Sequence, residues 1–384
     1  MWPILSGPLG LPMSNLRDTL LTNPLVSDLG SVIGADNFRL VGGCVRDALL
    51  GELPHDLDAC TSLVPSEILR RLSKTQKFDA HPTGIEHGTI TAVHAKSKKS
   101  IEVTTLRRDV VTDGRHAKVE FGTSWREDAA RRDFTINALM LDLKGGVYDF
   151  FDGEEDLRAG RIRFIGEPNA RLSEDWLRAL RYFRFWARYG KEYPNEATIQ
   201  ALSNAALNIS KISVERIWAE LKALAGTSRF WDALNLFEEL GFSDALGLTL
   251  AWPINRPNQS ELKPSQVWGA LLGGGPSLKR LRASRVEQAA AANMLLALDQ
   301  RTWFAKQALF GQDAAAAAHI WSGGDGNLPL IPAFPVKAED LFSIGLVQGP
   351  ELGKMLAALK KRWIVSEGQD SREDLLEWCK TSIM

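Results

Sequence analysis

The feature that most constrains the fold is a pair of glycines, Gly42 and Gly43, between an apolar run and a helical pattern. Residues 38–43 read FRLVGG and predict a short strand that enters a tight turn. Residues 44–51 (CVRDALLG) predict one or two helical turns, and residues 56–61 (DLDACT) predict a second strand. Because strand, helix and strand follow one another at short intervals, this part of the chain is expected to belong to an α+β or mixed-sheet domain.

Strand patterns are concentrated in the first part of the chain and helical patterns in the rest. We expect residues 112–122, which contain the turn signal Asp113-Gly114, to form a loop. Further strands are expected at 88–95 and 101–107, and amphipathic helices at 65–74, 172–190 and 213–226. The predicted fold class is therefore α+β with a mixed sheet.

Charge and cysteine usage exclude several classes of protein. The 384-residue chain has a formal net charge of −1, so it lacks a strongly basic tail, and no DNA partner is expected. Its three cysteines lie far apart without CxxC spacing, which argues against a zinc site and a disulfide framework and indicates a reducing, cytoplasmic location. No apolar run reaches 18 residues, so no membrane span is expected.

Carboxylates on the predicted strands are candidates for metal binding. Residues two apart on a strand point to the same side, so Asp56 and Asp58 would repel each other without water or a cation between them. Nucleotidyl transfer needs a metal at the phosphates, and Mg²⁺ prefers carboxylate and phosphate oxygens. Asp56 and Asp58 are therefore candidate metal ligands and catalytic residues, with Glu102 as a third candidate carboxylate. The alternatives are a hydrated surface strand for the aspartates and a solvated strand residue for Glu102.

Arginines accompany these carboxylates. Gly42 and Gly43 would let the backbone approach a phosphate closely, and Arg46 would add charged donors, although a tight turn is the simpler interpretation. In RRDFTINAL (131–139), Arg132 and Asp133 form either a triphosphate or ribose clamp or a surface salt bridge.

A second set of arginines follows in EDWLRALRYFR (174–184). Arg178, Arg181 and Arg184 recur every three residues, and Asp175 precedes the first of them by three. Apolar residues interleave with these charges. The helix therefore carries either a solvated ion-pair stripe or arginines that point into a cleft.

Together these motifs resemble the class II tRNA nucleotidyltransferases, the CCA-adding enzymes of the polymerase-β-like superfamily. The matching stretches are LVGGCVRDALLG, HDLDACT, EHGTITA, EVTTLRRDVVTDGRHAKVEF, RRDFTINAL, YDFFDGEEDLRAGRIRFIG, EDWLRALRYFRF and ISVERIWAEL. They cover roughly residues 38–225. The resemblance implies a polymerase-β-like head (1–151), a helical neck with a nucleotide-reading helix (152–245) and a helical body and tail (246–384).

The resemblance also implies roles for individual residues. Asp56 and Asp58 would hold catalytic Mg²⁺, Gly43 and Arg46 would contact the nucleotide's phosphates, and Arg132 would contact the nucleotide beside Asp133. The loop with Asp113, Gly114 and Arg115 resembles the flexible loop that the family needs for the A-adding step.

Base reading would fall to Asp175 and Arg178, with Arg181 and Arg184 in support. Cytosine and adenine both present an amine beside a ring-nitrogen acceptor, which an aspartate and an arginine match. Uracil and guanine present a carbonyl at the amine's place, and a buried unpaired polar group costs about 1–3 kcal/mol. One such pair would accept CTP and ATP and reject UTP and GTP.

The implied activity is addition of CCA to the 3′ end of tRNA. The alternatives are an A-adding enzyme, a bacterial poly(A) polymerase and an inactive RNA-binding protein. A basic cluster of Lys279, Arg280, Arg282 and Arg285 is either a tRNA phosphate contact or a solvated helix face.

Overall fold

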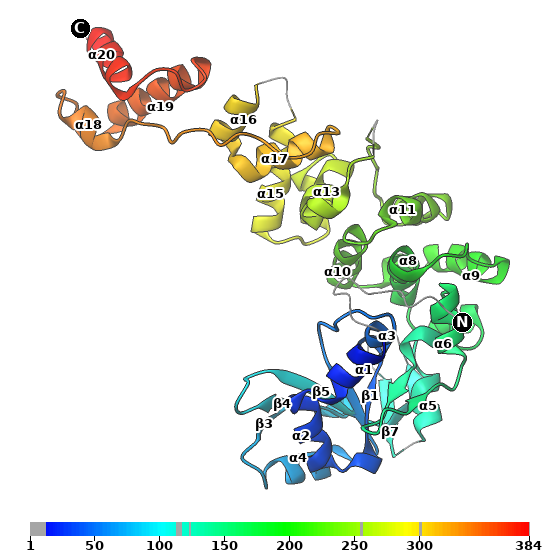
Figure 1. Ribbon diagram of the computed structural model, residues 1–384. Coiled ribbons are helices and arrows are strands. Elements are labelled where there is room, and N and C mark those ends of the chain that lie inside the picture. Colours follow the sequence, from blue (N-terminus) through cyan, green and yellow to red (C-terminus); the bar gives the residue numbers. More distant parts are fainter. Residues whose placement is uncertain (1–12, 113–116, 123, 254–255, 299–301, 384) are drawn as a thin grey trace. The chain divides into compact units, whose positions relative to one another are not determined.

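The computed structural model describes residues 13–112, 117–122, 124–253, 256–298 and 302–383. Figure 1 labels the helices and strands along the chain, which forms two compact units. The first unit comprises Met1–Ile212 and Asp232–Ala245, and the second comprises Ser213–Trp231 and Leu246–Met384. The expected boundaries after residues 151 and 245 stay predictions.

A seven-stranded mixed sheet is the centre of the first unit, with the order β3-β4-β5-β2-β1-β8-β9. Its strands are β1 (Phe38–Val41), β2 (Asp58–Thr61), β3 (Phe78–Gly84), β4 (Thr89–His94), β5 (Ser100–Thr105), β8 (Met140–Leu141) and β9 (Val147–Tyr148). Only the β2–β5 pair is parallel, and the other pairs are antiparallel. Strands β6 (Arg107–Thr112) and β7 (Ala117–Phe121) form a separate antiparallel pair.

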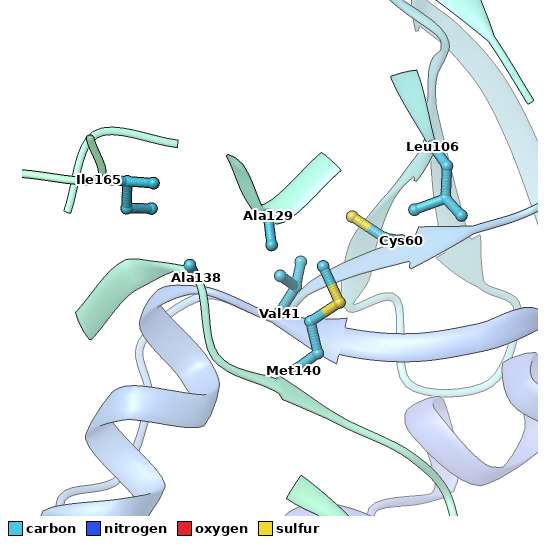
Figure 2. Packing of buried hydrophobic residues seen from close by; sticks show 7 residues of the cluster. All are labelled: Val41, Cys60, Leu106, Ala129, Ala138, Met140 and Ile165. Carbon is cyan, nitrogen blue, oxygen red and sulfur yellow. The ribbon is translucent and has the colours of Figure 1, made fainter. Parts of the chain in front are cut away.

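Helices accompany this sheet. Those of the first unit are α1 (Met13–Leu21), α2 (Pro24–Ile33), α3 (Gly43–Leu49), α4 (Pro65–Leu72), α5 (Trp125–Ala130), α6 (Gly153–Ala159), α7 (Pro168–Glu174), α8 (Leu177–Tyr189), α9 (Glu196–Ala206) and α12 (Phe242–Ala245). Figure 2 shows an apolar core beside the sheet, and its side chains are almost fully excluded from water. They come from β1, β2, β8 and α5 and from the loops that hold Leu106, Ala138 and Ile165. The core includes Val41, Cys60 and Met140. Burial of these side chains fixes β1 and β2 in place, and with them the segments that follow each strand.

The second unit is helical. Its helices are α10 (Val214–Ala225), α13 (Pro264–Leu271), α14 (Gly275–Arg280), α15 (Arg285–Leu296), α16 (Trp303–Phe310), α17 (Gln312–Trp321), α18 (Ala338–Phe342), α19 (Pro350–Val365) and α20 (Arg372–Ile383). Helix α11 (Phe230–Glu239) has residues in both units. The fully buried Trp268 donates its indole N–H to Leu221 O at 2.6 Å, and Trp363 lies in a second apolar cluster. No described helix is long and apolar enough to cross a membrane.

The mixed sheet and the helices confirm the predicted α+β class, but three local expectations are wrong. Residues 117–121 form β7, because Val119 and Phe121 alternate with charged residues at the strand period. The segment 172–190 holds two helices with a break at Asp175. Strand β2 begins only at Asp58, so Asp56 lies in the bend before it. The strand β3 was not predicted at all.

Candidate active site

The glycine turn between β1 and α3 lies against two guanidinium groups. Gly42 has φ +74°, a left-handed conformation that favours glycine. A Cβ on Gly42 would lie 3.4 Å from Arg132 Nη1, and one on Gly43 would lie 3.6 Å from Arg46 Nη2. The turn therefore brings backbone without side chains close to two guanidinium groups, an arrangement that suits a phosphate group.

Arg46 is buried and fully oriented by its neighbours. Its Nε and Nη2 donate to Asp47 Oδ1 at 2.9 and 2.7 Å, and its Nη1 donates to Asn137 Oδ1 at 2.6 Å. The guanidinium also stacks over the Tyr189 ring, 4.4 Å from its centroid. Since a guanidinium carries five N–H groups, two remain beyond these three bonds.

Carboxylates lie together at the start of β2. Asp58 is the parallel partner of Glu102 on β5, and both residues are exposed. Loss of hydration and the negative charge of Glu102 raise the pKa of Asp58; Arg132 lowers it, and Asp56 adds a further rise. Asp56 thus lies near Asp58 although the two do not share a strand, so strand alternation is the wrong reason for their proximity.

These carboxylates fit a divalent cation that also has ligands from substrate or water. Their mutual repulsion is relieved by a cation, and hard oxygen donors are what Mg²⁺ prefers. Among the described residues, no group of three or more His, Cys, Asp or Glu side chains is placed to hold a metal ion. The protein would therefore supply part of the coordination, as is usual for Mg²⁺ at nucleotide phosphates.

Arg132 is held by a buried carboxylate that the sequence analysis did not single out. Asp128 accepts from Arg132 Nη2 at 3.3 Å and from Arg131 Nε at 2.8 Å. Burial raises the pKa of Asp128, but the two guanidinium charges outweigh burial and lower it. Asp128 stands four residues before Arg132, a spacing that could have indicated the pair.

Asp133 connects the glycine turn to helix α8. Its Oδ2 accepts from Arg181 Nε at 2.6 Å, and its Oδ1 accepts from Asn137 Nδ2 at 3.0 Å. Asn137 in turn bonds Arg46, so a continuous chain of hydrogen bonds runs from Arg46 to Arg181. Burial opposes ionisation of Asp133, but Arg181 and these bonds lower its pKa. No periodicity or spacing in the sequence predicts the Asn137 link.

The break between α7 and α8 places Asp175 outside the helices. Its backbone is extended (φ −156°, ψ 104°), and its Oδ1 accepts from the Leu177 N–H at 3.1 Å. An aspartate that bonds the backbone two residues ahead competes with helix continuation, which explains the break. Asp175 is half-buried and stands one turn before Arg178.

Arg178 is held in several directions. Its Nη1 bonds Glu174 Oε2 and also donates to Arg171 O at 2.9 Å, and its Nη2 donates to Arg131 O at 3.2 Å. Arg184 stacks on the Phe185 ring at 4.5 Å. The arginines of α8 are therefore ordered, and Arg178 and Arg181 reach toward the segment that carries Arg131 and Asp133.

The structure thus brings most of the predicted site residues into one region of the first unit. Three do not enter this description, because Asp113, Gly114 and Arg115 lie outside the described residues. The basic cluster belongs to the second unit, where all four side chains are exposed. Arg282 forms an ion pair with Glu215, and Arg280 Nη1 donates to Gly247 O at 3.3 Å.

Comparison with known proteins identifies the family. Residues 38–163 match the family model described as "Poly A polymerase head domain". The CCA tRNA nucleotidyltransferase 1, mitochondrial, of Danio rerio is 35% identical over an alignment that covers 94% of this chain and 91% of the relative. The CCA-adding enzyme of Oceanobacillus iheyensis is 43% identical over 48% of this chain and 44% of its own length.

Solved structures agree in fold. The Bacillus stearothermophilus CCA-adding enzyme in complex with CTP is similar, with a TM-score of 0.74, 25% identity and coverage of 94% of this chain and 99% of that one. The Thermotoga maritima CCA-adding enzyme complexed with tRNA has the same fold, with a TM-score of 0.67, 18% identity and coverage of 97% and 98%. The chain therefore belongs to the class II tRNA nucleotidyltransferases, the family of the CCA-adding enzymes.

Proposed function

We propose that this protein adds C, C and A to the 3′ end of tRNA from CTP and ATP, without a nucleic-acid template. The observation that carries the proposal is the glycine turn flanked by Arg46 and Arg132, beside the carboxylates at the start of β2. In the proposed reaction the 3′ hydroxyl of tRNA attacks the α-phosphorus of the nucleotide. The new phosphodiester bond forms as the bond to diphosphate breaks.

Asp56 and Asp58 would hold Mg²⁺, and Glu102 would add negative charge beside Asp58. Mg²⁺ held there would neutralise phosphate charge and lower the pKa of the attacking hydroxyl. The glycine turn, Arg46 and Arg132 bind and orient the triphosphate, which places the α-phosphate in line with the hydroxyl. Since Arg46 and Arg132 are already held by Asp47 and Asp128, little reorganisation is needed when nucleotide binds.

Base choice would lie with Asp175 and Arg178 at the start of α8. Asp175 accepts from the exocyclic amine of cytosine or adenine, and Arg178 donates to the adjacent ring nitrogen. The bonds from Arg178 to Glu174 and to two backbone carbonyls fix the direction of its guanidinium. Arg181 and Arg184 would support the nucleotide, and the loop of residues 113–115 would serve the step from C to A.

The tRNA would be held mainly through its shape and backbone. Exposed basic residues of the second unit would contact its phosphates: Lys279, Arg280, Arg282 and Arg285.

We place the protein in the cytoplasm because its three cysteines are free and buried, as in reducing compartments. Cell fractionation tests this location, and recovery with mitochondria would overturn it.

Replacing the metal-binding carboxylates tests the proposed chemistry. We expect Asp56→Ala and Asp58→Asn to abolish incorporation of labelled CTP into tRNA that lacks its 3′ CCA. Retention of that tRNA on a filter should persist, because these carboxylates act in the chemical step. Unchanged turnover in either variant would contradict the assignment of that carboxylate. Asp79→Asn, an exposed position on β3, is the matched control and should behave as wild type.

A further inference from the structure

Tyr189, the last residue of α8, contacts the arginine at the glycine turn. Its hydroxyl donates to Asp47 Oδ1 at 3.1 Å, and its ring lies under the Arg46 guanidinium. The same Asp47 oxygen accepts from Nε and Nη2 of Arg46. Tyr189 therefore acts on both members of the Arg46–Asp47 pair, through a hydrogen bond to one and a ring face against the other.

The pair that Tyr189 contacts is well shielded from water. Arg46 and Asp47 are each 6% exposed, so neither can exchange its partner for solvent without moving. Burial raises the pKa of Tyr189 to about 12, and the hydroxyl therefore keeps the proton that it donates. In such surroundings a charged pair is held most firmly when its free donor and acceptor positions are also hydrogen-bonded, as Asp47 is to Tyr189.

We propose that Tyr189 is a positioning residue that fixes Arg46 at the glycine turn. Because Tyr189 belongs to α8, the helix that also carries Arg178 and Arg181, it ties the phosphate side of the site to the base-reading side. A second link is Asn137, whose side-chain oxygen accepts from Nη1 of Arg46, the guanidinium nitrogen that does not contact Asp47. With both links present, Arg46 keeps two N–H groups for the triphosphate. The inference rests on the proposed function, since it assumes that Arg46 binds nucleotide phosphates.

Removing the hydroxyl alone separates positioning from packing. Tyr189→Phe keeps the ring against Arg46 and deletes the bond to Asp47. We expect the KM for CTP and the KM for ATP to rise by the same factor, roughly 3- to 10-fold, which is the worth of one ordinary hydrogen bond, because the lost bond acts on the triphosphate only through Arg46. The preference for CTP over UTP should not change, because Asp175 and Arg178 are untouched. Inhibition by inorganic tripolyphosphate should weaken by a similar factor, since this probe carries no base.

Glu52→Gln is the matched control. Glu52 follows α3 and pairs with Arg188 of α8 at 3.0 Å, and the Arg188 guanidinium lies 4.9 Å from the centroid of the Tyr189 ring. Glu52→Gln removes the charge from this second link between the same two segments and keeps the groups that form the hydrogen bond from Tyr189 to Asp47. We expect wild-type KM values and tripolyphosphate inhibition. If Glu52→Gln reproduces the effects of Tyr189→Phe, packing of α8 rather than positioning of Arg46 is responsible, and the proposal fails.

Two further outcomes distinguish the proposal from the function on which it rests. If the wild-type protein adds no nucleotide to tRNA, the proposed function fails. If the wild-type protein is active and Tyr189→Phe has unchanged KM values and inhibition, only the role of Tyr189 is overturned. A double variant with Asp47→Asn completes the test: the combined loss should fall well short of the product of the single losses, because both changes disturb one arginine. Independent, multiplying losses would contradict the proposal.

Discussion

At the scale of single residues, four arginines of the candidate site are each held by a carboxylate. The pairs are Arg46 with Asp47, Arg132 with Asp128, Arg181 with Asp133, and Arg178 with Glu174. A buried charge without a partner costs several kcal/mol, so Asp47 offsets the cost of burying the Arg46 guanidinium, and the other three carboxylates orient arginines that are partly exposed. The arginines are thereby oriented before the nucleotide arrives, which reduces the ordering that binding must impose.

Gly42→Ala tests whether the bare backbone of the turn is needed. The new Cβ would lie 3.4 Å from Arg132 Nη1 at a backbone with φ +74°. We expect a loss of about 1–2 kcal/mol in the free energy of unfolding from the left-handed conformation. The added methyl would also take up space beside the Arg132 guanidinium where a phosphate is proposed to lie, so kcat/KM for CTP should fall by roughly tenfold or more.

Gly241→Ala is the matched control for Gly42→Ala. Gly241 has φ +80° and no atom within 4 Å of an added Cβ. It should lose similar stability, measured by chemical denaturation, and keep its activity. Equal activity losses in the two variants would show that backbone strain, rather than contact with Arg132, is responsible.

Arg178→Ala tests base reading. The variant removes the donor to the ring nitrogen, so the preference for CTP over UTP should fall by about tenfold or more, because the discriminating contact is lost. The preference is measured as the ratio of kcat/KM for CTP to kcat/KM for UTP, with tRNA that lacks CCA as the acceptor. Arg158→Ala, at an exposed ion pair of α6, is the control. An unaltered ratio in Arg178→Ala would refute the reading role.

At the scale of secondary-structure elements, most of the sheet and the main helices could be predicted from periodicity and glycine placement. The strand–glycine turn–helix unit at 38–49 is an example, because each part has its own local signal. The break at Asp175 could not be predicted from periodicity, since apolar spacing continues across it and a side-chain hydrogen bond decides the local conformation. Strand β3 was missed because its polar residues and Pro82 mask the strand pattern; it lies at the edge of the sheet, where proline is tolerated.

The candidate site, too, could be predicted from the sequence only where its residues carry a local signal. Asp56, Asp58 and the glycines carry local signals, whereas Asn137 and Tyr189 gain their contacts only when distant segments meet. Hydrogen bonds between residues 91 and 142 positions apart have no signature in a single sequence. The resemblance to the family implied the roles of the site residues, and only the structure shows which neighbours orient Arg46.

Glu287 joins two helices of the second unit and makes their packing sensitive to pH. It accepts from Lys222 Nζ at 2.9 Å, from Trp218 Nε1 at 3.4 Å and from the Ser284 N–H at 2.7 Å. Burial raises the pKa of Glu287, but these donors outweigh burial and lower the pKa to about 2. A carboxylate with a lowered pKa stabilises the fold above its ordinary value of 4.5, and this contribution is lost as pH falls from there toward 2.

Glu287→Gln should therefore destabilise the protein at pH 7 by about 1–2 kcal/mol, with a smaller difference from wild type at pH 3. Thermal unfolding of both proteins at the two pH values measures this. Glu351→Gln, at an exposed pair with Lys354, is the control and should change little. A difference between wild type and Glu287→Gln that is the same at both pH values would contradict the account.

At the scale of the whole molecule, the proposed site residues are distributed over two compact units. The first holds the carboxylates, the glycine turn and α8, and the second exposes the basic cluster around α14 and α15. With a formal net charge of −1, the chain has no general excess of positive charge to attract RNA. Binding of tRNA should therefore depend on where its basic residues are placed.

Removal of Lys279 and Arg285 charges tests this placement. The double variant Lys279→Gln, Arg285→Gln should bind tRNA more weakly. Its plot of log association constant against log salt concentration should be less steep by roughly 1 to 2, as expected for two lost phosphate contacts. The control is Lys263→Gln with Asp313→Asn, which removes an exposed ion pair of the second unit outside the basic cluster without changing the net charge, and it should keep the wild-type salt slope. Equal salt slopes for wild type and the Lys279, Arg285 variant would rule out phosphate contacts at these positions.

The most direct test of the account is the sequence that the protein adds. Transfer RNA that ends before its CCA is incubated with the protein, Mg²⁺ and all four nucleoside triphosphates, and the 3′ ends are sequenced. The account predicts that C, C and A are added in that order, that addition then stops, and that Asp56→Ala adds nothing. Long A tails, addition of A only to tRNA that already ends in CC, or no addition at all would contradict it.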